Sequence, residues 1–111
     1  TDLKFKVSKG RIRQSVMGWC FKSKPNPVDG PTLAKMAAEI GLAGIEGISR
    51  QDYSAARKLG LAISLVSSHG FKTGPYSREQ HQYCRDKLVE AIDIAAEVRC
   101  PSVITFTGFS Q

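Results

Sequence analysis

The sequence contains no long hydrophobic run and no close cysteine pair, and both absences narrow the classes of protein it can represent. None of its apolar stretches approaches the roughly 20 residues of a membrane-spanning helix, so no membrane contact is expected. Its three cysteines, Cys20, Cys84 and Cys100, are widely spaced. A reducing compartment, the cytoplasm, is therefore expected, with the thiols as small, partly buried side chains. The chain begins with Thr1, so removal of an export signal upstream stays open.

The motifs of several enzyme classes are also missing. No Gly-x-Gly-x-x-Gly follows the first predicted strand, and no Gly-Lys-Ser/Thr triplet occurs, so a nucleotide-phosphate loop is not indicated. Ser67 and Ser68 lack the context of a nucleophile elbow, which gives hydrolase chemistry little support. No cluster of acidic residues and histidines suits a catalytic divalent metal ion, so metal ligands are not expected in this chain.

Acidic residues are scarce at the beginning of the chain. Residues 1–25 contain seven basic side chains and one acid, which accounts for the whole net charge of +6, and residues 26–111 carry nine of each sign. A basic segment can contact nucleic acid or can simply be solvated. Because no aromatic side chains interleave with the basic ones as in single-strand binders, nucleic-acid binding is the weakest of the functions considered.

Start and stop signals predict three helices. Asp29-Gly30-Pro31 begins the first, and Gly41 ends it. The second extends from near Asp52 to Gly60. The third opens with a capping box over residues 77–80 and cannot continue past Pro101. The apolar faces predicted for the first and third helices are Leu33, Met36, Ala37 and Ile40, and Leu88, Ala91, Ile92, Ala95 and Ala96.

Four short apolar segments predict strands, at residues 12–21, 44–48, 63–69 and 102–108. Their nearly continuous apolar character is typical of a parallel sheet covered on both faces. Alternating strands and helices form either an open doubly wound sheet or a β/α barrel. Polar residues at the strand ends favour the barrel. We therefore expect a basic arm over residues 1–11, and over residues 12–111 the N-terminal half, about four β/α units, of a (β/α)8 TIM barrel.

Three residues at or near the strand ends are candidates for a site. His69 could hold a substrate hydroxyl or relay a proton, or it could anchor the following loop. Glu46 is a carboxylate within an apolar strand, so it either faces the substrate or braces a neighbouring strand through hydrogen bonds. Trp19 could form an apolar wall against a substrate, although packing is the simpler interpretation. Thr105 and Thr107 line the fourth predicted strand.

One further pair has a spacing that suits metal binding on a helix. His81 and Cys84 are three residues apart, but two ligands fall short of the usual three or four. We interpret this pair as part of a solvated helix face.

The sequence resembles the hydroxypyruvate isomerase-like group of the xylose isomerase-type sugar isomerases and epimerases over roughly residues 11 to 108. The matching stretches keep their order, which makes the set more specific than any one of them. They are Arg13-Gln14-Ser15-Val16 with Trp19-Cys20, Gly44-Ile45-Glu46-Gly47-Ile48, Ile63-Ser64-Leu65-Val66-Ser67-Ser68-His69-Gly70 and Val103-Ile104-Thr105-Phe106-Thr107-Gly108.

The resemblance implies a TIM barrel that interconverts a small α-hydroxy aldehyde with its ketone isomer. It implies a divalent metal, Mg²⁺ or Mn²⁺, that binds substrate oxygens, and acidic residues that move protons through an enediolate. The metal ligands and proton-transfer glutamates of the family belong to later strands, so they match no position here and are expected after Gln111. His69, Glu46 and, less closely, Trp19 match residues near the family's substrate mouth.

Two functions follow as expectations. In the first, the full-length protein is an isomerase of a small polar carbonyl substrate, hydroxypyruvate or a sugar, and these 111 residues alone are inactive. In the second, the chain is a non-enzymatic half-barrel that pairs with itself, as a homo-oligomer, or with a partner chain, because a lone four-strand sheet leaves two unpaired edges.

Overall fold

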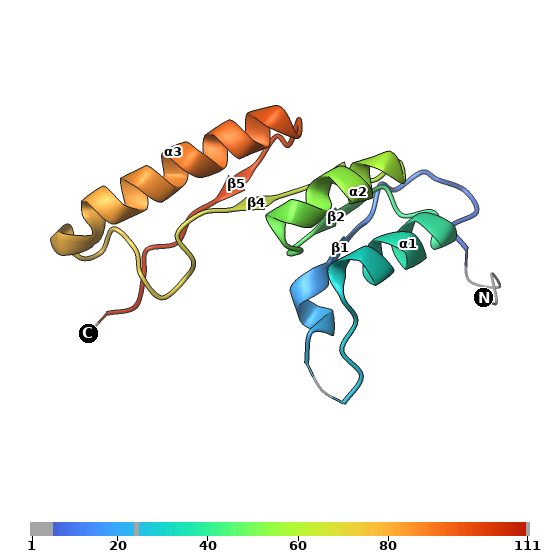
Figure 1. Cartoon of the computed structure of the whole chain (residues 1–111), viewed down its shortest axis with the longest axis horizontal. Helices are drawn as coiled ribbons and strands as arrows, with labels where there is room; N and C mark the ends of the chain where they lie inside the picture. Colours follow the sequence, from blue (N-terminus) through green and yellow to red (C-terminus); the bar gives the residue numbers. More distant parts are fainter. Residues whose placement is uncertain (1–5, 24, 111) are drawn as a thin grey trace. The chain divides into compact units, whose positions relative to one another are not determined.

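The computed structural model describes residues 6–23 and 25–110, which fold as an α/β chain with three α-helices and only parallel strand pairs (Figure 1). The α/β class predicted from the sequence is therefore confirmed. The chain divides into two compact units, residues 1–64 and residues 65–111, and each is described by itself. Within the described residues, no helix combines the length and the apolar character needed to cross a membrane.

Two predictions concern the ends of the chain and fall on residues outside the described ones. The first five residues of the predicted basic arm, Thr1 among them, lie outside the described range, so only residues 6–11 of that arm can be compared with the structure. Gln111, after which the metal ligands are expected, also lies outside it. The placement of those ligands after Gln111 therefore stays a prediction.

The first unit is built on a parallel sheet in the order β1-β2-β3. Ile45 in the central strand pairs with Val16 on one side and Ile63 on the other. Each strand is shorter than predicted: Gly47, with a φ of +68°, turns the chain away directly after β2. The strands are β1 (Ser15–Met17), β2 (Gly44–Glu46) and β3 (Ala62–Ile63).

The two faces of this sheet differ in character. The Ile45 and Ile63 side chains are fully buried. Because side chains alternate along a strand, Ser15, Glu46 and Ser64 fall on the opposite face, where they stay partly or largely exposed. The prediction that both faces are covered is therefore wrong for this sheet within the part of the chain that the structure describes.

Helix α1 (Gly30–Ile40) forms where the sequence predicts it. The Asp29 carboxylate caps the helix by accepting a hydrogen bond from the Thr32 N–H at 2.7 Å. Of the four-residue stripe predicted for its apolar face, Leu33 and Ala37 are buried, but Met36 is 47% exposed. Ala34, which lies outside the predicted stripe, is buried instead, at 2% exposed.

All three helices end in the same backbone motif. A residue with positive φ follows each helix, and the next N–H bonds back to a carbonyl in the last turn. Gly41 and Gly60 occupy this position after α1 and α2 (Tyr53–Lys58), whereas Arg99 occupies it after α3 (His81–Glu97). The third helix therefore ends before Pro101, through a left-handed arginine at a φ of 57°.

The second unit consists of helix α3 packed on two short parallel strands (Figure 1). Cys84, Ala91 and Ala95 form the buried side of this helix. Ile92 and Ala96, which were predicted to belong to that side, are exposed, because the buried stripe follows positions 84, 88, 91 and 95 and is narrower than predicted. The strands are β4 (Val66–Ser67) and β5 (Val103–Ile104).

Two local predictions fail at the remaining elements. The predicted strand over residues 63–69 is divided, because β3 pairs with β2 whereas β4 pairs with β5. The predicted capping box does not form: the Ser77 side chain caps nothing, and the Gln80 N–H bonds to the Ser77 carbonyl in a 3-10 turn. The 3-10 helices are η2 (Gly18–Phe21), η3 (Arg50–Asp52) and η4 (Arg78–Gln80).

The three cysteines are free thiols in different surroundings. Cys84 and Cys100 are buried and act as small apolar core residues, as expected. Cys20 is exposed on η2, so the expectation of partial burial is wrong there.

Candidate functional site

His69 forms the centre of a hydrogen-bonded site in the second unit. Its side chain is only 7% exposed, yet both ring nitrogens have a partner. Nδ1 lies 2.6 Å from the Thr73 carbonyl oxygen, and Nε2 lies 2.8 Å from the Thr105 hydroxyl. Among the described residues, no buried polar side-chain atom is left without a partner.

These two contacts define where the protons lie when the ring is neutral. A carbonyl oxygen can only accept, so Nδ1 must carry the hydrogen that it shares with Thr73. Nε2 is then unprotonated and accepts the Thr105 hydroxyl proton. The result is a chain from the Thr105 O–H to His69 Nε2, and from His69 Nδ1–H to a fixed backbone carbonyl. A hydroxyl, an imidazole and a third group that orients the ring form the general arrangement of an activated hydroxyl.

The register of the two strands creates this pair. β4 and β5 are parallel, and Ser67 pairs with Ile104, so their carboxyl ends lie at the same edge. Thr105 follows β5 directly, and His69 follows β4 by two residues. Thr105 is an exposed residue, and its hydroxyl contacts the imidazole of a buried one.

The loop after His69 is tied to the segment after β5. The Tyr76 N–H donates to the Thr107 carbonyl at 2.9 Å, and the Phe109 N–H donates to the Lys72 carbonyl at 3.1 Å. Gly74 permits this close approach, since a Cβ there would collide with the Thr107 carbonyl group. Thr73, which orients the imidazole, is therefore held in place by its neighbours on both sides.

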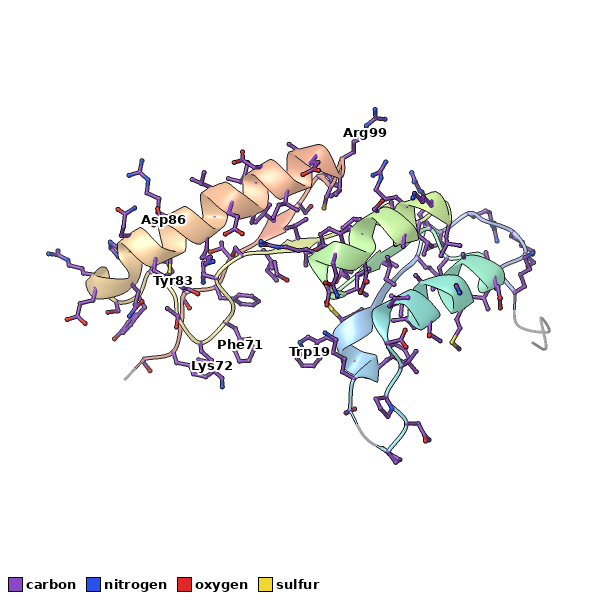
Figure 2. The ribbon with its side chains drawn as sticks, in the orientation of Figure 1. Trp19, Phe71, Lys72, Tyr83, Asp86 and Arg99 are labelled. Carbon is purple, nitrogen blue, oxygen red and sulfur yellow. The ribbon has the colours of Figure 1, made fainter. Side chains whose placement is uncertain are left out.

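Three phenylalanines cluster near the same loop. The Phe71 ring lies 6.2 Å from the Phe106 ring, edge to face, and 5.7 Å from the Phe109 ring. Their exposed fractions are 45%, 38% and 60%, respectively. Figure 2 labels Phe71 and Lys72 on this loop. The second unit thus presents an aromatic surface in addition to a polar one.

Glu46 lies in a separate hydrogen-bonded chain, in the first unit. The Ser64 hydroxyl donates to Glu46 Oε2 at 2.8 Å, and the Ser15 and Ser64 hydroxyl oxygens are 2.6 Å apart. Since the Ser64 hydrogen is directed at the carboxylate, Ser15 must donate to Ser64. Gly44 pairs with Ser15 in the central strand, and a Cβ there would lie 3.3 Å from Ser15 Oγ. The chain ties the three strands together, which supports the bracing role considered for Glu46.

Trp19 follows β1 on η2, and its indole is 62% exposed. The ring projects away from the 3-10 helix (Figure 2). Packing, the simpler interpretation of Trp19, is therefore not what the described residues show. The tryptophan is free to contact a ligand or another chain.

His81 and Cys84 both contact the loop of residues 73–75. His81 Nε2 donates to the Pro75 carbonyl at 2.7 Å, and the Cys84 side chain is only 2% exposed. The interpretation of the pair as a solvated face is wrong for Cys84, which faces the loop of residues 73–75. Residues 6–23 and 25–110 contain no group of three or more metal-ligating side chains, so they offer no ligand set for the metal that the resemblance implies.

Ser68 is occupied by the backbone, because its hydroxyl donates to the Ile104 carbonyl at 2.5 Å. Sequence reasoning identified His69 and noted Thr105, but it did not pair them. The signal was the register: if Ser67 and Ile104 are partners, the next residues along each strand converge. The backbone partner Thr73 had no sequence signal.

Comparisons of the chain with protein-family models, curated proteins and solved structures gave no match.

Proposed function

We propose that this chain forms part of an isomerase that interconverts a small α-hydroxy aldehyde with its ketone isomer, as with tartronate semialdehyde and hydroxypyruvate or a sugar pair. The support comes from the ordered sequence resemblance and from parallel strands whose carboxyl ends carry polar side chains. We also propose that the chain forms the N-terminal half of a TIM barrel.

The observation that carries the proposal is the 2.8 Å contact between buried His69 and the hydroxyl of Thr105, an exposed residue. Thr105 donates its hydrogen to His69, so its oxygen lone pairs are directed elsewhere and can accept a hydrogen bond from a substrate hydroxyl. Substrates of this class carry adjacent oxygens on a short carbon skeleton. A hydroxyl oxygen that accepts a hydrogen bond, and that itself donates to an imidazole, can bind one of these substrate oxygens.

The pair can also hold a proton during the reaction. When the substrate hydroxyl loses its proton, the proton passes to Thr105 while the Thr105 proton passes to His69 Nε2. The resulting imidazolium keeps its Nδ1–H bond to the Thr73 carbonyl, which stabilises the added charge. Reversing the transfer at the neighbouring oxygen returns the proton, and substrate and product remain isomers. We assign the transfer of the carbon-bound proton to carboxylates outside this chain.

The other two candidates have lesser parts in the proposal. Glu46 is engaged by Ser64, so we assign it first to holding the strands and second to contact with substrate. Trp19 is exposed and available as an apolar surface for a carbon skeleton. The described residues offer no metal ligand set. We therefore assign the Mg²⁺ or Mn²⁺ to residues after Gln111 in a longer protein, and the proton transfer through Thr105 and His69 does not depend on it.

The test is isomerisation in D₂O, monitored by NMR for both interconversion and deuterium incorporation at carbon. The protein from the complete reading frame is expected to be active with Mg²⁺ or Mn²⁺, and these 111 residues alone are expected to be inactive. Thr105→Ser keeps the hydroxyl and is the matched control for Thr105→Val, which should lower kcat/KM at least about tenfold. Equal activity of the Ser and Val variants would remove Thr105 from the mechanism. Robust turnover by the 111 residues alone would refute the assignment of the metal and of the carbon-bound proton transfer to residues outside this chain.

The exposed phenylalanine cluster favours a second candidate, a non-enzymatic chain that associates with itself. Phe71, Phe106 and Phe109 place large apolar rings on the surface of one unit. Light scattering across a concentration series distinguishes the candidates. Association that Phe109→Ser abolishes, with no isomerase activity in the complete protein, would favour the second candidate over the first.

A further inference from the structure

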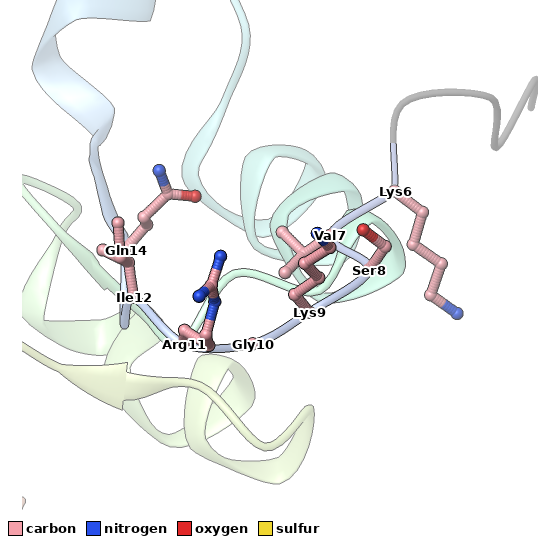
Figure 3. A pocket seen from close by; sticks show the side chains of 8 residues that line it. All are labelled: Lys6, Val7, Ser8, Lys9, Gly10, Arg11, Ile12 and Gln14. Atoms are coloured by element: carbon pink, nitrogen blue, oxygen red, sulfur yellow. The ribbon is translucent and has the colours of Figure 1, made fainter.

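The basic segment of residues 6–14 is held against the first unit at both ends. The Val7 N–H donates to the Ile40 carbonyl at 2.7 Å, at the end of α1. The Gln14 carbonyl accepts from the Ala43 N–H at 2.8 Å, directly before β2. Between these two contacts the backbone curves outward (Figure 3). The segment is therefore a bridged loop with fixed ends.

This loop encloses an open cavity of about 590 Å³, within the range of small-molecule sites in proteins. Its lining includes three cationic residues and no aspartate or glutamate. Gly10, with a φ of +60°, makes the turn, and nothing lies within 4 Å of the position that a Cβ would occupy there. The lining residues are Lys6, Val7, Ser8, Lys9, Gly10, Arg11, Ile12 and Gln14.

The cations of the cavity have no counter-ion among residues 6–23 and 25–110. None of Lys6, Lys9 and Arg11 forms a salt bridge there. The Arg11 guanidinium and the Gln14 amide project to the same side of the loop, whereas the Lys6 side chain points away (Figure 3). A guanidinium and an amide on one side of a concave surface provide several N–H donors directed at one volume.

We propose that this cavity binds a phosphate-bearing small molecule. Cations without counter-ions, in a concave surface that has no carboxylates, attract anions and raise their local concentration. Phosphate is an anion that a guanidinium binds in a bidentate manner, and the Gln14 amide adds a neutral donor. The lining has no aromatic side chain on which the bases of a nucleic acid could stack, so a compact polyanion is the more suitable ligand. This site is independent of the isomerase proposal.

The experiment is calorimetric titration of the 111-residue chain, at low ionic strength, with inorganic pyrophosphate and with fructose 1,6-bisphosphate. Arg11→Gln and Lys9→Gln each remove one lining charge. Lys22→Gln is the matched control, since it removes the same charge from an exposed residue outside the cavity. Circular dichroism melts verify that each variant is folded.

We expect about a fivefold to tenfold rise in Kd for each lining variant and less than about a twofold rise for Lys22→Gln. Equal weakening by all three variants would overturn the proposal, because it would show a diffuse field rather than a site. Absence of binding by either probe would overturn it as well. Tighter binding of a short poly-thymidine oligonucleotide, with affinity that increases with its length, would overturn it in favour of a nucleic-acid surface.

Discussion

Replacing Arg99 by glycine is predicted to stabilise the second unit. Arg99 is the one described non-glycine residue with positive φ, at 57°, and it ends helix α3. Glycine occupies the equivalent position after α1 and α2. The Arg99 side chain extends away from the end of the helix (Figure 2), and it makes no salt bridge within the described part of the chain. Removal of the Arg99 side chain should therefore change stability mainly through the backbone conformation at this position.

The expected gain follows from three terms. A side chain in the left-handed region costs about 1–2 kcal/mol, which glycine avoids. Glycine also gives the unfolded chain more conformational freedom, which lowers the free energy of unfolding by about 0.4–1 kcal/mol and so opposes that gain. Loss of a cation near a helix C-terminus removes a further few tenths, about 0.3 kcal/mol at an exposed site. The net gain in the free energy of unfolding for Arg99→Gly is about 0.5 kcal/mol.

Urea unfolding monitored by circular dichroism measures this gain. Arg99→Ala is the control, because it removes the charge but keeps a Cβ in the left-handed region, so it should be about 1 kcal/mol less stable than Arg99→Gly. Gly60→Ala makes the opposite change at an open position, where a Cβ would have no neighbour within 4 Å. It should be destabilising. If Arg99→Gly is less stable than Arg99→Ala, the assignment of the helix end is wrong.

Two further predictions concern single side chains. The hydrogen bond from the Thr32 N–H lowers the pKa of Asp29 below its usual value of 3.8. The ionised carboxylate therefore stabilises the folded chain above pH 3.8, and this stabilisation is lost as the pH falls through the lowered pKa. The difference in stability between the wild type and Asp29→Asn, measured by urea unfolding, should therefore shrink below the usual carboxyl pKa; a constant difference from neutral pH into acid would contradict it. Gly74→Ala should lower the free energy of unfolding by at least about 2 kcal/mol, because its Cβ would collide with the Thr107 carbonyl group; a loss below about 0.5 kcal/mol would show that the loop gives way.

The predictable parts of the fold are those that local chemistry determines. Asp29, Pro31 and Gly41 specify the ends of α1 through a cap, a fixed φ and a left-handed turn, and the structure has all three. The α/β class followed from the alternation of helix and strand signals. These features need only neighbouring residues along the chain.

The parts that failed depend on contacts distant in sequence. Nothing local shows that the segment from Ile63 to His69 divides its pairing between β2 and β5. Ser77 fits a capping box by sequence, but the 3-10 turn uses the backbone instead. Met36 is exposed whereas Ala34 is buried, so the buried face of α1 is displaced from the stripe that the apolar spacing predicts.

The candidate site shows the same division. Position at a strand end was enough to identify His69, because parallel strands bring their carboxyl ends together. Its partners Thr105 and Thr73 depend on strand register and on the path of a loop, which the sequence does not specify. Glu46 was identified for its chemistry, while its attachment to Ser64 depends on the sheet register.

Side-chain nitrogen NMR of His69, during titration with hydroxypyruvate, measures directly whether the His69–Thr105 pair receives a substrate hydroxyl. When the ring is neutral, we expect hydrogen on Nδ1 and none on Nε2, and a shift of the Nε2 signal on addition of the compound. Thr105→Val should abolish that response, and Thr105→Ser should keep it. Hydrogen on Nε2 of the neutral ring, or a ring whose signals do not respond to the compound in the wild type, would contradict the central claim that His69 and Thr105 together receive a substrate hydroxyl.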